Sequence, residues 1–166
     1  MSSVKKNILV CSLLSFPCGA FVACGDDKTD AQKSADDACE HMEKGPPVGV
    51  TATVSETAAP TIKNDDKRYD VALVNYLSEK GGFVKFSAAS AKEYAFYVNN
   101  NVPLTFKNAS GNFVGLHASE KPFAACTDVV ASYTYSLTSG VTSIEIGPTS
   151  ETLVSFVVEE LAAHKH

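Results

Sequence analysis

The fold is decided by residues 81–106, which read GGFVKFSAASAKEYAFYVNNNVPLTF. Apolar and aromatic runs occupy residues 83–86, 94–98 and 102–106, and Gly-Gly and Asn-Asn-Asn turns mark their ends. Short runs rich in Val, Phe and Tyr, bounded by Gly and Asn, are typical of β-strands joined by turns. Pro103 cannot donate to a strand ladder, so the third run is expected at an edge or a bulge.

The same pattern of apolar runs separated by turn residues continues on both sides of this stretch. Period-two alternation between apolar and polar residues predicts further half-buried strands, and Gly, Pro, Asn and Ser turns separate them. These runs lie at residues 48–54, 71–76, 113–116, 129–137, 141–146 and 153–158. No helical pattern stands between the strands, which argues against βαβ units. The sequence therefore predicts a mainly β protein: an antiparallel, jelly-roll-like β-sandwich of about eight or nine short strands.

One short helix is expected before the first strand. Alanines at 31, 35 and 38 and Met42 recur near a 3.6-residue spacing, and Gly45-Pro46-Pro47 stops the pattern. We expect a helix over residues 31–44, within a helix-plus-sandwich domain of residues 31–160. Residues 24–30 are polar and predict a flexible tether, and residues 161–166 form a histidine-containing tail.

The first 23 residues have the three parts of a secretory signal peptide. Lys5 and Lys6 precede an apolar run at residues 8–16, and a small residue, Ala23, ends the segment. The run is too short to cross a bilayer, which needs roughly 20 apolar residues. An ordinary secretory cleavage and an uncleaved anchor remain the alternatives to the cleavage described next.

The residues Phe21-Val22-Ala23-Cys24 resemble the bacterial lipobox, usually Leu-(Ala/Ser)-(Gly/Ala)-Cys, with Phe21 in place of the usual Leu. The resemblance implies a lipoprotein whose Cys24 carries the acyl chains of a membrane anchor. It also implies the bacterial cell envelope, facing the periplasm or the surface. The outer membrane is favoured because Gly25, and not the retaining Asp, follows Cys24.

The cysteine count agrees with a lipidated Cys24. Cys11 and Cys18 leave with the signal peptide, so Cys39 and Cys126 remain as an even pair in an oxidising compartment. We therefore predict a Cys39–Cys126 disulfide. The alternative is that Cys39 is a metal ligand beside His41.

The negative charge of the chain makes anionic partners unfavourable. The chain of 166 residues has a formal net charge of −5, which becomes more negative when Lys5 and Lys6 leave with the signal peptide. Arg68 is its one arginine. An acidic chain of this kind is a poor match for nucleic acid or for an anionic lipid surface.

Residues 68–160 resemble the pre-peptidase C-terminal domain, a small bacterial β-sandwich appended to secreted enzymes. The similarity lies in the strand beginning Asp70-Val-Ala-Leu, in Phe83-Val-Lys-Phe-Ser-Ala, in the hairpin Asn108-Ala-Ser-Gly-Asn and in Gly140-Val-Thr-Ser-Ile-Glu-Ile. The aromatic residue usual after that glycine is absent, because Val141 and Thr142 stand there. The resemblance implies a domain without catalysis that aids folding, localisation or ligand binding.

The histidines suggest the first specific function. His41 lies at the end of the expected helix, His117 at a strand end, and His164 and His166 in the tail. Imidazole nitrogen suits Zn²⁺ and Cu²⁺, so a fold that gathers these four histidines would bind a divalent transition metal. The alternative is that they are solvated surface side chains, because no HxxxH or CxxC spacing is present.

The sequence gives weaker evidence for other kinds of functional site. Asp65, Asp66 and Asp70 lack the spacing of a calcium loop and are expected to form a turn. No G-x-S-x-G elbow occurs, and we expect no enzymatic activity. The second candidate function is an adhesive module that binds an envelope protein or polysaccharide through exposed aromatic residues of the sandwich.

Overall fold

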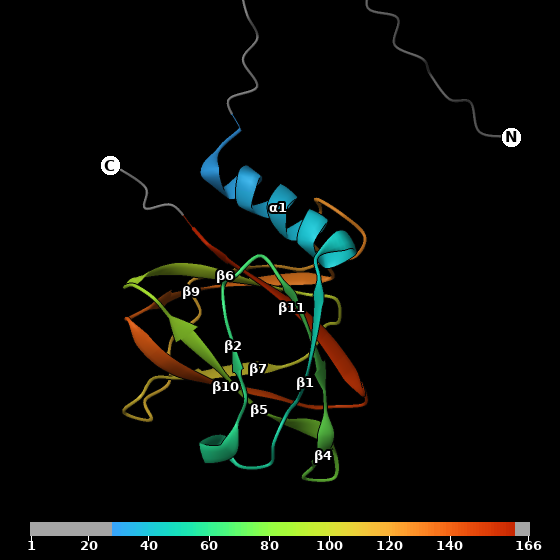
Figure 1. Ribbon diagram of the computed structural model, residues 1–166, viewed down its shortest axis with the longest axis vertical. Helices are drawn as coiled ribbons and strands as arrows, with labels where there is room; N and C mark the ends of the chain where they lie inside the picture. Colours follow the sequence, from blue (N-terminus) through green and yellow to red (C-terminus); the bar gives the residue numbers. More distant parts are fainter. Residues whose placement is uncertain (1–27, 162–166) are drawn as a thin grey trace, which may run out of the picture.

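A computed structural model describes residues 28–161 (Figure 1). The helix α1 (Asp30–Lys44) lies over the outer face of one sheet of a two-sheet β-sandwich. The mainly β fold with one N-terminal helix is thus confirmed. None of the helices described between residues 28 and 161 has the length and hydrophobicity needed to cross a membrane. The signal peptide, Cys24, most of the tether and the histidines of the tail lie outside the described residues.

Helix α1 begins and ends where the sequence predicts. Thr29 and Gln32 form a reciprocal capping box that satisfies free backbone N–H groups of the first turn. At the other end, the N–H of Gly45 donates to the carbonyl of His41 at 2.9 Å, and Pro46 and Pro47 follow. Pro cannot continue the hydrogen-bond pattern, so the chain leaves the helix and enters the first strand.

The strands form two sheets. The six-stranded sheet has the order β1 (Pro47–Thr51), β3 (Arg68–Ala72), β11 (Leu153–Glu160), β6 (Lys92–Val98), β9 (Ala131–Leu137), β8 (Ala118–Glu120). The other sheet has the order β2 (Thr61–Ile62), β5 (Glu79–Ala88), β10 (Gly140–Thr149), β7 (Leu104–Lys107), with β4 (Val74–Tyr76) also paired to β5. A short 3₁₀ helix, η1 (Glu56–Ala58), precedes β2.

The expectation of purely antiparallel sheets is wrong at two places. Strands β1 and β3 pair in parallel, and so do β2 and β5. Parallel neighbours need a crossover connection. In each case the connection passes through the opposite sheet. Between β1 and β3 the chain forms β2 of the five-stranded sheet, and between β2 and β5 it forms β3 of the six-stranded sheet. Strand β2 therefore lies between the expected strand runs at residues 48–54 and 71–76, where the sequence indicated no strand.

The expected strand at residues 113–116 is also wrong. After the turn at Asn108–Gly111, the chain returns along β7 and makes a single bridge, between Lys107 and Phe113. The strand of this region is β8, a few residues later, where a loop was expected. Apolar character alone did not give a ladder here, since the segment makes only this bridge to the outer edge of β7.

The core lies between the two sheets, and aromatic rings fill it. Phe86, Phe96 and Phe106 are fully buried, and Phe96 packs edge-to-face against both of the others. Phe106 stacks on Tyr135 with ring centroids 3.8 Å apart. Such aromatic pairs stabilise beyond the area that they bury.

A second, smaller cluster joins α1 to the outer face of the six-stranded sheet. Ala38 and Met42 of α1 pack there with Tyr97 of β6 and Val157 of β11. The buried hydroxyl of Ser34 hydrogen-bonds that of Tyr97 at 3.0 Å. The outer face of this sheet is therefore a second buried layer wherever the helix covers it.

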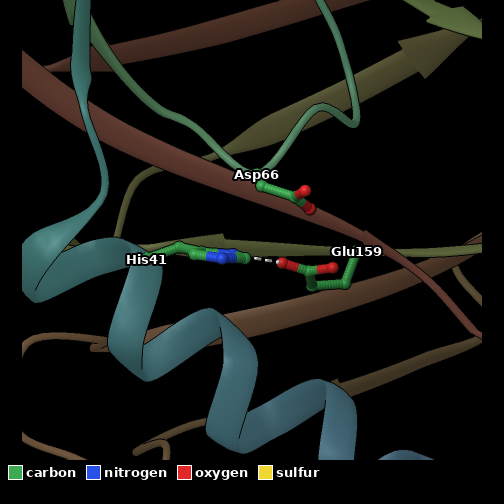
Figure 2. A group of neighbouring side chains, drawn as sticks. All are labelled: His41, Asp66 and Glu159. Carbon is green, nitrogen blue, oxygen red and sulfur yellow. Dashed lines mark hydrogen bonds and ion pairs between the residues drawn. The ribbon is translucent and has the colours of Figure 1, made fainter.

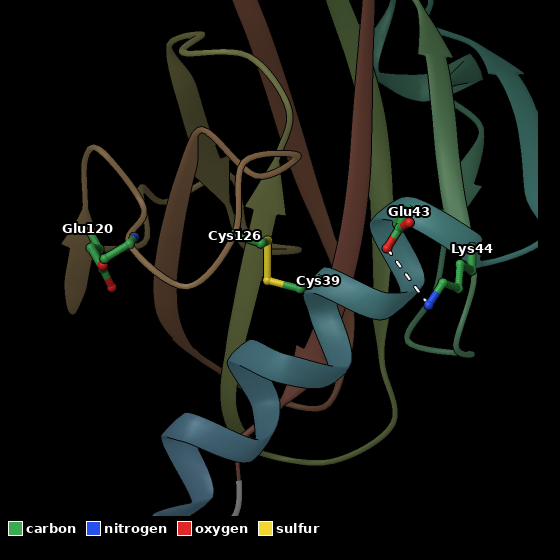
Figure 3. Close-up of a disulfide and its surroundings, with 6 residues drawn as sticks. Cys39, Glu43, Lys44, Glu120 and Cys126 are labelled. Atoms are coloured by element: carbon green, nitrogen blue, oxygen red, sulfur yellow. Dashed lines mark hydrogen bonds and ion pairs between the residues drawn. A yellow bond between two sulfur atoms is a disulfide. The ribbon is translucent and has the colours of Figure 1, made fainter.

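The predicted disulfide is confirmed (Figure 3). Cys39 of α1 is bonded to Cys126 in the loop between β8 and β9, with Cα atoms 6.0 Å apart. The loop contributes Phe123, whose ring meets that of Tyr97 edge-to-face, to the same small cluster. Cys39 is thus engaged as a half-cystine, and the alternative that it ligates a metal is wrong.

Candidate functional site

The structure brings His41, Asp66 and Glu159 together at the C-terminal end of α1 (Figure 2). Each offers one nitrogen or oxygen atom that can bind a metal, and these atoms lie within 4.8 Å of one another. The three residues come from the helix, from the loop before β3 and from the end of β11. The cluster exists only because the helix is docked on the sheet.

His41 is held by the helix and by its partner. It lies in the last turn of α1, and its Nδ1 is 2.9 Å from Oε1 of Glu159. A carboxylate oxygen accepts, so in this contact Nδ1 of His41 donates its proton to Glu159. The side chain of His41 is 25% exposed, and that of Glu159 is 12% exposed.

Glu159 is a buried carboxyl on an otherwise apolar face. It follows Val157 by two residues on β11 and faces the helix side of the sheet, opposite Ala95 of β6. Burial raises the pKa of Glu159, and the hydrogen bond and charge of His41 oppose that rise. Within residues 28–161, His41 is the one hydrogen-bond partner of this carboxylate, which accepts through Oε1. A nearby positive charge would stabilise the ionised form of this carboxyl.

Asp66 is placed by a loop that is fixed to β11. The amide of Asn64, oriented with its nitrogen toward Val158, donates to that carbonyl at 2.8 Å and accepts from the N–H of Glu160 at 3.2 Å. Asp66 then adopts a left-handed backbone with φ 56°, a conformation that Asp tolerates better than most residues. The turn aims its exposed carboxyl at the His41–Glu159 pair, as Figure 2 shows.

Arg68 fixes the helix end beside this loop. One guanidinium nitrogen donates to the carbonyl of Met42 at 2.9 Å, and Nε donates to Asp70 at 3.0 Å. The carbonyl of Met42 lies in the last turn of α1, where backbone acceptors have no partner within the helix. Ser155 also donates to Asp70, at 2.7 Å. The single arginine of the chain therefore links α1, β3 and β11 next to the cluster.

The other aspartates do not form a calcium loop. Asp65 accepts from Lys67 at 2.8 Å and from the hydroxyl of Tyr69 at 2.9 Å, while Asp70 is bound to Arg68. Asp65 and Asp66 lie in the bend before β3, as expected of a turn, whereas Asp70 lies within β3, so the expectation is wrong for Asp70. Of the three aspartates, Asp66 is the one that meets a histidine.

His117 has a different partner. Its Nε2 is 3.3 Å from Oε1 of Glu93 on β6, and the side chains are 57% and 32% exposed. Among residues 28–161, the metal-capable group that contains His41 does not contain His117. The backbone N–H of Leu161, the last described residue, donates to the carbonyl of Glu93 at 2.9 Å, so the tail starts beside His117. His164 and His166 lie outside the described residues.

Sequence reasoning missed both carboxylates of the cluster. Glu159 stands at an alternating position of the last strand, where a polar residue on an apolar face is the available signal. Asp66 stands among turn residues that carry no metal-ligand spacing. Their partnership with His41 depends on which face of the sheet the helix covers.

The chain was compared with models of protein families and with curated proteins, and neither comparison gave a match.

Proposed function

We propose that this protein binds a divalent transition metal ion, Zn²⁺ or Cu²⁺, through His41, Asp66 and Glu159. The observation that carries the proposal is the convergence of one imidazole and two carboxylates within 4.8 Å. A divalent cation would offset the negative charge of the carboxylates of Asp66 and Glu159 when they bind it. Imidazole nitrogen with carboxylate oxygen is a donor set that zinc and copper accept.

The geometry needs only a small adjustment. Zinc bonds of about 2.0–2.2 Å in a tetrahedral arrangement place neighbouring donor atoms about 3.3–3.5 Å apart. Nδ1 of His41 and Oε1 of Glu159 are 2.9 Å apart in their hydrogen bond. Both would bind one ion once the proton on Nδ1 is released or moves to Nε2 and the two atoms separate slightly. Asp66 is exposed, so rotation of its side chain brings the third donor in at little cost. The buried Glu159 gains most, because the cation offsets the desolvation of its charge.

The role we propose is binding without catalysis, in a protein held at a bacterial membrane by acyl chains on Cys24. The lipobox-like residues before Cys24 support the anchor, and the Cys39–Cys126 disulfide suits the oxidising envelope. The anchor has its own test. Intact-mass measurement of the membrane fraction should find a mature chain that begins at an acylated Cys24, and Cys24→Ala should release the protein from that fraction.

Metal titration of the untagged full-length protein tests the site. Isothermal titration with Zn²⁺ and Cu²⁺ should give one ion per chain. His41→Ala, Asp66→Asn and Glu159→Gln should each weaken binding about tenfold or more, since even positioning residues of metal sites contribute that much. His117→Ala is the matched control, because it removes a histidine that also pairs with a glutamate. It should change the affinity less than about twofold.

Two outcomes would contradict this assignment. Failure to take up either metal would end the metal proposal. An equal loss in His117→Ala, and in the double variant His164→Ala and His166→Ala, would move the site to the four histidines that the sequence suggested.

A further inference from the structure

A groove opens at the side of the sandwich, between β7 of one sheet and β9 of the other. Strand β7 is the last strand of the five-stranded sheet, and β8 is the last strand of the six-stranded sheet. The groove is lined mainly by apolar and aromatic side chains: Leu104, Phe106, Phe113, Leu116, Tyr133 and Tyr135. The rings of Phe106, Tyr133 and Tyr135 are buried and form the floor of the groove.

The segment beside the groove has the sequence of a strand but pairs with β7 through a single bridge, between Lys107 and Phe113. Phe113 is 75% exposed and Leu116 is 50% exposed. Between them, Val114 is the one residue whose backbone N–H finds a backbone acceptor within residues 28–161, the carbonyl of Phe106 at 2.9 Å. Successive residues of an extended chain point their backbone groups to opposite sides. The backbone groups of Phe113 and Gly115 therefore face away from β7, as at a free strand edge.

The charge of the groove is opposite to that of the chain. Lys121 is the charged residue that lines it, with Nζ 4.4 Å from the centre of the Tyr133 ring. At the other side, Nζ of Lys107 lies 5.5 Å from the centre of the Phe113 ring and 3.7 Å from Glu145. The whole chain has a formal net charge of −5. This contrast favours an acidic partner and disfavours a second copy of this chain, because the two copies would repel each other.

The polar groups of the groove suit a peptide better than a sugar. The hydroxyl of Tyr133 already donates to the carbonyl of Val102 at 3.2 Å. Its ring is also buried, so it presents no open face for a sugar to stack on. Within residues 28–161, the backbone N–H and C=O groups of Phe113 and Gly115 have no hydrogen-bond partner, and their spacing matches another extended chain.

We propose that this groove binds an extended, acidic and apolar segment of a partner protein as an added strand. Its backbone pairs with the free edge at residues 113–115. Its alternate apolar side chains fill the groove against Leu104 and Leu116, and its carboxylates meet Lys121 and Lys107. None of these residues belongs to the cluster of His41, Asp66 and Glu159, so this surface is independent of the proposed metal site.

The probe is a displayed library of random twelve-residue peptides, panned on the full-length protein in lipid nanodiscs after subtraction on empty nanodiscs. Selected sequences should alternate apolar and acidic residues. The best of them, made as a soluble peptide, should slow hydrogen exchange at the amides of Phe113 and Gly115. Slowed exchange at these amides reports an added strand, which nonspecific adhesion to exposed phenylalanine would not give.

Variants at exposed positions keep the fold intact. Phe113→Ser and Leu116→Ser should each weaken the selected peptide about tenfold or more, because each removes apolar area that the peptide would bury. Lys121→Glu should weaken it similarly. Leu77→Ser is the matched control, since Leu77 is 80% exposed in the turn between β4 and β5 and should leave the affinity unchanged.

The proposal is overturned if panning selects no motif above the empty nanodiscs, or if Phe113→Ser and Leu116→Ser bind the selected peptides as tightly as the wild type. Binding of polysaccharides on a glycan array, lost in Leu116→Ser while no peptide is selected, would assign the groove to sugar and would also overturn it. Loss of binding in Leu77→Ser to the same extent would show general stickiness and would count against the groove.

Discussion

His41–Glu159 and His117–Glu93 are the same chemical pair in two settings. Both involve the six-stranded sheet, and both join a histidine to a glutamate on a strand, at 2.9 Å and 3.3 Å. The first pair is covered by α1 and has Asp66 beside it, whereas the second is open to solvent. Burial strengthens a charge interaction, while water screens it. The two pairs have the same residue types, so it is coverage by α1 that makes His41–Glu159 a candidate site.

Removing the disulfide should give the largest effect and should separate the two pairs. The chain-entropy model assigns about 4–5 kcal/mol to a cross-link over the 87 residues between Cys39 and Cys126. The double variant Cys39→Ser and Cys126→Ser should lose stability of this order in urea unfolding. Imidazole resonances of His41 should shift and broaden as α1 loosens, while those of His117 should not. Equal changes at both histidines would show that the helix does not define the site.

Met42→Ala should come next, because it empties part of the small cluster beneath α1. Met42 is 4% exposed, and truncating a buried methionine costs about 2–5 kcal/mol. Urea unfolding measures the loss, and metal titration should show weaker binding because His41 precedes Met42 in the helix. Glu43→Ala is the control on the exposed side of the same turn and should change stability by less than about 0.5 kcal/mol. A similar loss in both variants would mean that the helix, and not its buried face, is responsible.

Glu159→Gln should change stability by no more than about 1 kcal/mol, because the amide keeps an acceptor for His41. Its effect lies in the pH dependence. The folded protein raises the pKa of Glu159 above its ordinary value of 4.5, so between these pKa values the folded state holds the proton and the unfolded chain does not. Stability of the wild type should therefore fall as pH rises through this window.

Urea unfolding in metal-free buffer from pH 4 upward measures this slope. The Gln variant should lack it, and Glu93→Gln should retain it, because Glu159 is still present there. If the wild type gained stability over the same window and the Gln variant did not, the buried carboxyl would be stabilised as an anion by His41.

His117→Ala should have the smallest effect. Its ion pair with Glu93 is solvent-exposed, and such pairs contribute about 0–1 kcal/mol. We expect a change of less than about 0.5 kcal/mol in urea unfolding, at low and at high salt. A larger, salt-dependent loss would show that the second pair is as important to the fold as the first.

The sequence predicted the features that depend on neighbouring residues or on residue counts. The alanine spacing and Gly45-Pro46-Pro47 predicted α1, because capping and proline act within a few residues. Counting cysteines predicted the Cys39–Cys126 bond. Alternation predicted most strands, since half-buried strands must alternate wherever they pair.

The predictions that were wrong concern contacts between distant parts of the chain. Residues 113–116 have strand character, but within residues 28–161 they make one bridge, to β7, and no ladder. The parallel pairs arise because the chain changes sheets between β1 and β3, which no local pattern records. For the site, His41 was selected by residue type, whereas Glu159 joins it from 118 residues away through the docking of the helix.

The disulfide also determines how the molecule would respond to a pulling force. Cys39 and Cys126 enclose most of the strands in a covalent loop, including β1 to β8. A load applied between Lys28 and Leu161 passes through the sulfur atoms and does not extend that loop. At about 3.5 Å per residue, the 87-residue separation removes roughly 300 Å from the length that the oxidised chain can reach. Of the strands, only β9, β10 and β11 would bear the load, and reduction would expose the rest to it.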